Sequence, residues 1–288
     1  MKRIAIIGLG LIGGSLALAL KKKAGARGTE IVGFSRSRET VARAKECGAI
    51  DRASGNLASA VAGADLVVIA TPVMTTKEVL ASISEHLSPK CLVTDTGSTK
   101  SQVMQWAGEY LPSKVSFIGG HPMAGKETFG ISGADASLFR GCVWCLTPSP
   151  CATSLAVRRL KKLVESVGAK PFFVDAETHD NLVAGVSHLP MLLSTAFVTT
   201  TTKSRLWPEM AKLAAGGYRD FSRLASGNPE MNRDICLTNR EKITDWLDRY
   251  IEVLKGYHNL VAEDSEELAD MLAQAREARE KWLRGENL

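Results

Sequence analysis

The sequence has little of several features that mark common classes of protein. Aromatic residues make up only 6% of its 288 residues, and no tract of lysine and arginine is interleaved with them, so we expect no nucleic-acid partner. Apolar runs such as LVVIAT are too short to cross a bilayer, and the strand-like start MKRIAIIGLG leaves no room for a signal peptide. We therefore expect a cytoplasmic protein with no membrane partner.

The cysteines are few and scattered. Of the six, Cys142 and Cys145 have C-x-x-C spacing, but they lie in an apolar, strand-like run where residues three apart point to opposite faces. No second pair accompanies them, so we expect no metal site, and the scattered thiols suit a reducing compartment.

The composition that remains is that of a folded globular protein. Hydrophobic residues make up 45% and charged residues 23%, and the length suggests one large domain or two. The formal net charge of +5 suits a protein that attracts anionic small molecules.

The first half of the chain alternates strand and helix patterns. Helical patterns lie between most of the segments that have a buried-strand pattern. These segments are RIAIIGLG, TEIVGFSR, ADLVVIATP, CLVTDTGS, KVSFIGG, GCVWCLTP and KPFFVD. Such alternation predicts an α/β fold with a mostly parallel sheet, covered on both faces. From about Ala176 only helical patterns follow, beginning with one long helix disturbed near Pro190. We predict a Rossmann-type dinucleotide-binding domain over residues 1–175 and an all-helical domain over residues 176–288.

A glycine-rich turn joins the first strand to the first helix. Gly8, Gly10 and Gly13 have G-x-G-x-x-G spacing, and the context of strand, turn and helix is the one that dinucleotide binding requires. Gly8 permits the tight turn, Gly10 admits the pyrophosphate, and Gly13 lets the helix approach the strand. The intervening Leu11 and Ile12 begin the helix, whose free N–H groups would face the phosphates. The alternative is a turn with no ligand.

The end of the second strand bears on the choice of cofactor. An NAD-preferring protein usually has an acidic residue there, but this chain has Ser35, Arg36 and Ser37. No carboxylate would repel a 2′-phosphate, and Arg36 could bind it by a charge-assisted hydrogen bond. The sequence therefore favours NADP over NAD, unless these arginines are merely solvated.

Four other residues fall at or near the expected carboxyl edge of the sheet. Thr71 and Pro72 end the third strand pattern and should lie beside the cofactor. Ser98 lies at the next strand-to-helix turn, where its hydroxyl could cap the helix or meet a substrate. His121, between two glycines and a proline, is expected in a rigid turn rather than a regular strand.

Taken together, the motifs resemble those of the prephenate and arogenate dehydrogenases of tyrosine biosynthesis. The segments GLGLIGGSLA, ATP, TDTGSTKS, GGHPMAGKETFG, HDNLVAGVSHLP and GYRDFSRLASGNPEMNRDI occur in the family's order and cover nearly the whole chain. The resemblance implies a dinucleotide domain joined to a helical domain that forms most of a homodimer interface. It also implies oxidative decarboxylation of a cyclohexadienyl substrate, prephenate or arogenate, with hydride transfer to NAD(P).

The resemblance also assigns roles to individual residues. His121 of HPMAG matches the family's general base, and a neutral imidazole suits the removal of a hydroxyl proton. Ser98 would lie near both the substrate hydroxyl and this histidine. Arg223 of DFSR matches an arginine that grips a carboxylate, a task suited to the guanidinium fork. Glu127 and Ser187 match further positions that line the family's active site.

The helical segment leaves two questions open. His179 and His188 are nine residues apart, so on a straight helix they face opposite ways, and either one or both could meet the substrate. Many prephenate-type members read SHLPH where this chain reads SHLPM, which places the apolar Met191 on the substrate side. Together with SRSR, this tilts the substrate prediction toward arogenate.

Two alternatives remain. Another dehydrogenase built on the same plan, such as a β-hydroxyacid dehydrogenase or an imine reductase, would not need HPMAG, SHLP and DFSR together. A non-catalytic NADP-binding sensor would keep the glycine turn but would have no need for His121, Ser98 and Arg223.

Overall fold

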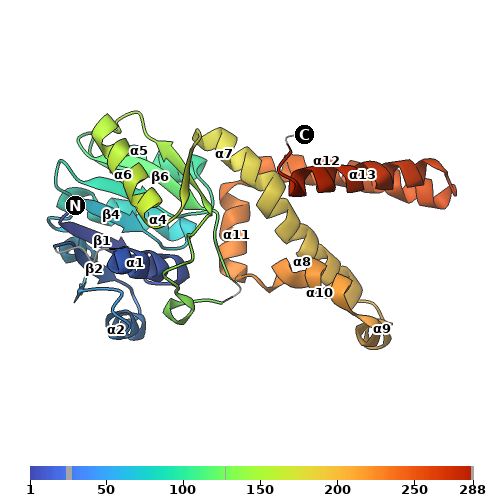
Figure 1. The fold of residues 1–288 in the computed structure, drawn as a ribbon, viewed down its shortest axis with the longest axis horizontal. Helices are drawn as coiled ribbons and strands as arrows, with labels where there is room; N and C mark the ends of the chain where they lie inside the picture. Colours follow the sequence, from blue (N-terminus) through green and yellow to red (C-terminus); the bar gives the residue numbers. More distant parts are fainter. Residues whose placement is uncertain (24–27, 127, 287–288) are drawn as a thin grey trace. The chain divides into compact units, whose positions relative to one another are not determined.

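The computed structural model describes residues 1–23, 28–126 and 128–286. The chain forms two compact units, Met1–Arg240 and Glu241–Leu288. Unit 1 holds the sheet and the helices around it (Figure 1). The predicted boundary between residues 175 and 176 stays a prediction, although the last strand ends at Phe173 and only helices follow from Ala176.

An eight-stranded sheet forms the centre of unit 1, in the order β3-β2-β1-β4-β5-β6-β7-β8. Neighbouring strands are parallel except for β6 and β7, which are antiparallel, so the prediction of a mostly parallel sheet is confirmed. The strands are β1 (Arg3–Ile7), β2 (Glu30–Phe34), β3 (Arg52–Ala53), β4 (Leu66–Ile69), β5 (Leu92–Asp95), β6 (Ser116–Pro122), β7 (Val143–Pro148) and β8 (Lys170–Phe173).

Helices cover both faces of this sheet, and the side chains of β1 show how the two cores divide. Ile4 and Ile6 pack into one apolar cluster with α1 and α6, whereas Ala5 and Ile7 pack into a second cluster with α3, α4 and α5. The alternation follows from the pleat of a strand buried on both faces. The helices of this part are α1 (Leu11–Lys23), α2 (Arg38–Glu46), α3 (Leu57–Val61), α4 (Val73–Ile83), α5 (Ser101–Tyr110) and α6 (Ser154–Ser166), with short 3₁₀ turns η1 (Ser84–His86) and η2 (Ile131–Gly133).

The long helix predicted after Ala176 is present, with one irregular turn. It runs through α7 (Ala176–Val183), a π-helical turn η3 (Ala184–His188) and α8 (Leu189–Thr202), as the yellow helices of Figure 1. Pro190 has no N–H to donate to the carbonyl of the preceding turn, so a regular α-helix cannot pass this point unchanged. The prediction of a disturbance near Pro190 is therefore confirmed.

This helical run also passes a simple test for a membrane span. By length and composition Ala176–Thr202 could cross a bilayer, because an 18-residue window within it has a mean hydropathy of 1.5. Its first half nevertheless buries His179, Asp180 and His188 within unit 1, as the core helix of a folded domain would.

The remaining helices follow in short steps. Asn228 caps the helix that begins at Pro229, where its side chain accepts a hydrogen bond from the backbone of Met231. These elements are α9 (Trp207–Leu213), α10 (Gly216–Ser222), the 3₁₀ turn η4 (Arg223–Ser226), α11 (Pro229–Thr238), α12 (Arg240–Ala262) and α13 (Glu267–Leu283).

Candidate active site

A cavity of about 680 Å³ lies in unit 1, at the carboxyl ends of β1, β4, β5 and β6. This is the edge where ligands bind in open α/β sheets. The cavity brings together segments distant in sequence, from the glycine turn to α11. The predicted site residues that line it are Gly10, Leu11, Ile12, Thr71, Pro72, Ser98, His121, Ser187, His188, Met191 and Arg223.

The three glycines of the turn have different roles: Gly8 and Gly13 are required by the fold, whereas Gly10 faces the cavity. A Cβ atom at Gly8 would lie 2.4 Å from the carbonyl oxygen of Ala70, and Gly8 also has a φ of +95°. A Cβ at Gly13 would lie 1.9 Å from the carbonyl oxygen of Gly8. A Cβ at Gly10 would meet no protein atom within 4 Å, although Gly10 lines the cavity. The fold therefore needs glycine at positions 8 and 13, whereas the open space at Gly10 fits the close approach of a pyrophosphate.

Other predicted residues lie outside the cavity lining. Ser35, Arg36 and Ser37 follow β2, and the Ser37 hydroxyl accepts a hydrogen bond from the backbone of Thr40 to cap α2. His179 does not line the cavity but lies behind His121. Glu127 lies outside the described residues.

His121 lies in strand β6, not in the turn that the sequence predicted. It pairs with Cys145 of β7, and the prediction of an irregular backbone was wrong because β7 continues the sheet up to this point. The glycine before it is explained by packing: a Cβ at Gly120 would lie 2.5 Å from the carbonyl oxygen of Asp95. The ring is buried, with 8% of the residue exposed, and it faces the cavity. Burial, followed by the nearby His179 and Lys100, lowers the pKa of His121 well below its ordinary value.

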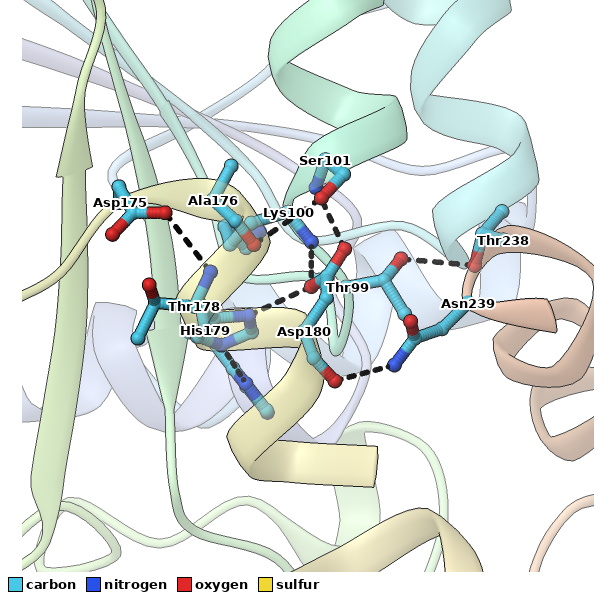
Figure 2. A network of polar contacts seen from close by, with 12 residues as sticks. Thr99, Lys100, Ser101, Asp175, Ala176, Thr178, His179, Asp180, Thr238 and Asn239 are labelled. Atoms are coloured by element: carbon cyan, nitrogen blue, oxygen red, sulfur yellow. Dashed lines mark hydrogen bonds and ion pairs between the residues drawn. The ribbon is translucent and has the colours of Figure 1, made fainter. Parts of the chain in front are cut away.

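The helix cap that was one of the two alternatives for Ser98 is made by another residue. Helix α5 has no side-chain cap from its own N-terminal segment. Instead, the carboxylate of Asp180 accepts hydrogen bonds from the backbone N–H groups of Lys100 and Ser101, at 2.7 and 2.8 Å (Figure 2). Ser98 lines the cavity, so its hydroxyl is available to a ligand there.

Four buried polar residues around the site were missed by the sequence analysis. Asp180 and Asn239 contact the two histidines of the helical run, and Asp95 forms a buried ion pair with Lys100. Asp95, Lys100 and Asp180 lie within the quoted motifs TDTGSTKS and HDNLVAGVSHLP, so their place in these motifs was a usable signal. Asn239 falls in no such motif.

The fold and the cavity together define a class of protein. A parallel sheet, a G-x-G-x-x-G turn that opens α1, and a cavity with an imidazole at the carboxyl edge are the features of a dinucleotide-dependent dehydrogenase. Residues 16–172 match the family model "Prephenate dehydrogenase, nucleotide-binding domain", and residues 175–274 match "Prephenate dehydrogenase, dimerization domain".

Individual proteins agree with the family models. The chain is 38% identical to the prephenate dehydrogenase of Bacillus subtilis over 96% of its own length and 75% of that protein. The crystal structure of the Aquifex aeolicus prephenate dehydrogenase with hydroxyphenyl propionate and NAD+ aligns with a TM-score of 0.89 and 31% identity, covering 98% of each chain. The Synechocystis arogenate dehydrogenase aligns with a TM-score of 0.82 and 31% identity, covering 97% of this chain and 99% of the other.

The chain belongs to the prephenate dehydrogenase family. It is therefore an NAD(P)-dependent oxidoreductase of the prephenate and arogenate dehydrogenase type, and both alternatives from the sequence, a β-hydroxyacid dehydrogenase and a sensor without activity, are set aside.

Proposed function

We propose that this enzyme converts arogenate to tyrosine by oxidative decarboxylation, with NADP as the acceptor, and that prephenate is its weaker substrate. The observation that carries the proposal is the single cavity that contains the dinucleotide turn at Gly10, the imidazole of His121 and the guanidinium group of Arg223. A cofactor and a carboxylate-bearing ring could therefore bind next to each other in a cavity that also contains a base.

The residues of the cavity suit the chemistry. Gly10 and the N-terminus of α1 would hold the pyrophosphate of the dinucleotide, and the bound nicotinamide would accept a hydride from C4 of the substrate. His121 takes the proton of the C4 hydroxyl as a carbonyl forms there, and Ser98 lines the same cavity with a hydroxyl. Arg223 holds the substrate carboxylate until it leaves as carbon dioxide and the ring becomes aromatic.

The preference for arogenate rests on Met191. This residue lines the cavity and is 8% exposed. An apolar thioether thus stands where many prephenate-type members have a second imidazole. The keto-acid side chain of prephenate would gain no hydrogen bond or positive charge from this position.

The preference for NADP rests on Arg36. It is exposed at the end of β2, and no carboxylate stands beside it in the SRSR segment. Because the Aquifex relative was crystallised with NAD+, the cofactor has to be tested separately from the family.

We also propose that the protein is cytoplasmic and forms a homodimer through the helical segment of residues 176–288. Large apolar side chains are exposed along it, including Val186 at 74%, Leu206 at 65% and Leu213 at 83%. The match to the family's dimerization domain supports the same arrangement. Sedimentation of the purified protein as a monomer at micromolar concentration would contradict it.

The deciding experiment is a steady-state comparison of both substrates with both cofactors. We expect the highest kcat/KM for arogenate with NADP. A higher kcat/KM for prephenate would reverse the proposed substrate preference, and a higher value with NAD would reverse the proposed cofactor preference. Activity with neither substrate would contradict the proposed function as a whole.

A further inference from the structure

Two imidazole rings face the cavity, and each is bound from behind by a different kind of group. The Nδ1 atom of His121 lies 2.9 Å from the Nε2 atom of His179, in α7. The Nδ1 atom of His188 lies 3.2 Å from the side-chain nitrogen of Asn239, just after α11. A neutral ring has one donor and one acceptor nitrogen. Each contact at Nδ1 therefore decides whether Nε2 of the same ring is a donor or an acceptor.

The contact behind His121 extends to a carboxylate. The Nδ1 atom of His179 lies 2.8 Å from Oδ1 of Asp180, and a carboxylate only accepts, so Nδ1 of His179 carries the hydrogen. Its Nε2 atom then has a lone pair and accepts from Nδ1–H of His121. The chain of donors therefore runs from His121 through His179 to Asp180.

The position of Asp180 favours a neutral His179. Besides this ring, Asp180 accepts two hydrogen bonds from the backbone N–H groups at the start of α5 (Figure 2). A helix N-terminus stabilises a negative charge. Burial acts to raise the pKa of Asp180, but the hydrogen bonds from the His179 ring and from these backbone groups outweigh it, so the pKa is lowered. The carboxylate therefore does not need a protonated imidazole to remain charged, and a cationic ring with 1% exposure would be costly.

In the contact behind His188 the ring nitrogen accepts a hydrogen bond, whereas Nδ1 of His121 donates one. The side-chain nitrogen of Asn239 donates one hydrogen to the carbonyl oxygen of Asp180, at 2.7 Å, which fixes the orientation of the amide. Its second hydrogen points to Nδ1 of His188, which must accept. The hydrogen of His188 is therefore on Nε2, a buried atom with no partner among the described residues, in a ring that lines the cavity.

We propose that His179, held by Asp180, and Asn239 are positioning residues that fix opposite tautomers in the two rings facing the cavity. His121 presents the lone pair of Nε2 to the cavity and acts as the base, whereas His188 presents Nε2–H and donates to an acceptor oxygen of the substrate. This inference rests on the proposed function for the identity of the substrate but not for the tautomers themselves.

The proton transfer follows from this arrangement. The O–H bond of the substrate hydroxyl breaks, its proton forms a bond to Nε2 of His121, and its electron pair completes the new carbonyl as the hydride leaves the same carbon. The imidazolium that results keeps its Nδ1–H bond to His179. The lone pair of His179 can stabilise this charge without any further proton movement.

The first test is a measurement of the tautomers in the resting enzyme. The chain has five histidines, so ¹⁵N labelling of histidine gives a small set of ring signals, and His121→Asn and His188→Gln assign the two that matter. At pH 8 we expect His121 protonated at Nδ1 only and His188 protonated at Nε2 only. His121 protonated at Nε2, His188 protonated at Nδ1, or a cationic His179 would each overturn the proposal. Because this measurement needs no substrate, it is independent of any failure of the proposed activity.

The second test separates positioning from simple packing. Gln at position 179 can place an amide oxygen where Nε2 accepts, whereas Leu fills similar space without an acceptor. We expect His179→Leu to lower kcat by about 10- to 100-fold with little change in substrate KM or cofactor Kd, and His179→Gln to recover most of the loss. Equal losses in the two variants, or a loss confined to KM, would overturn the positioning role.

Discussion

Lys100 and Asp95 form an ion pair in which neither side chain has any exposed surface. Asp95 also accepts hydrogen bonds from the backbone N–H groups of Gly97 and Gly120, at 2.7 and 3.0 Å. The pair thus ties the end of β5 to α5 and to the residue before His121. We expect it to fix the backbone that carries the base, and its contribution to stability can be measured.

Asp95→Asn should destabilise the protein strongly, because it leaves the buried ammonium group of Lys100 without a counter-charge. The expected loss is about 3–5 kcal/mol in the free energy of unfolding, measured by urea denaturation. Glu39→Gln breaks the exposed ion pair with Arg43 and serves as the control, with little expected change. Similar small effects of both variants would mean that the buried pair does not hold this region together.

His121→Asn tests the assignment of the base. The amide of Asn can still donate to His179, but it cannot take a proton from the substrate. We expect kcat to fall by about 10²- to 10⁴-fold while the Kd of the dinucleotide, measured by fluorescence titration, changes little. Turnover within tenfold of the wild type would remove His121 from the catalytic step.

The pH dependence of the reaction should reflect the buried position of the same ring. Its pKa is lowered by burial, then by His179, Lys100 and His188, and only the unprotonated ring can accept a proton. A lower pKa keeps the active form present at lower pH, so the acidic limb of the kcat/KM profile should lie below pH 6.5, the ordinary histidine value. An apparent pKa at or above 6.5 in the free enzyme would contradict this environment.

The glycine turn allows a matched pair of variants. Gly13→Ala should destabilise the fold by about 1–3 kcal/mol, because its Cβ would lie 1.9 Å from the carbonyl oxygen of Gly8. Gly10→Ala should leave the thermal midpoint nearly unchanged but raise the dinucleotide Kd about tenfold or more, since its Cβ would occupy only the open space of the cavity. Unchanged binding by Gly10→Ala would mean that the pyrophosphate lies elsewhere.

Local patterns in the sequence were sufficient for the sheet and the glycine turn. Strand and helix periodicity, together with the spacing of Gly8, Gly10 and Gly13, depends on residues close in sequence. The turn predicted at His121 was wrong because β7, more than twenty residues later, pairs with it. The role of Asn239 was missed because it lies 51 residues from His188, and nothing in its neighbourhood points to that contact.

The arrangement of His179 and His188 likewise could not be predicted from local sequence patterns. Spacing on a regular helix left open whether one ring or both meet the substrate, and the π-helical turn between them could not be derived from the residues alone. In the structure only His188 lines the cavity, whereas His179 reaches it through His121.

Arg36→Ala tests the cofactor preference at the end of β2. If the guanidinium group binds the 2′-phosphate, its loss removes a charge-assisted hydrogen bond and should raise the KM for NADP by about ten- to a hundredfold, while the KM for NAD changes less than about twofold. Arg38→Ala is the matched control, because Arg38 is also exposed but begins helix α2. Equal effects of Arg36→Ala on the two cofactors, or an equal loss from Arg38→Ala, would contradict a specific contact between Arg36 and the 2′-phosphate.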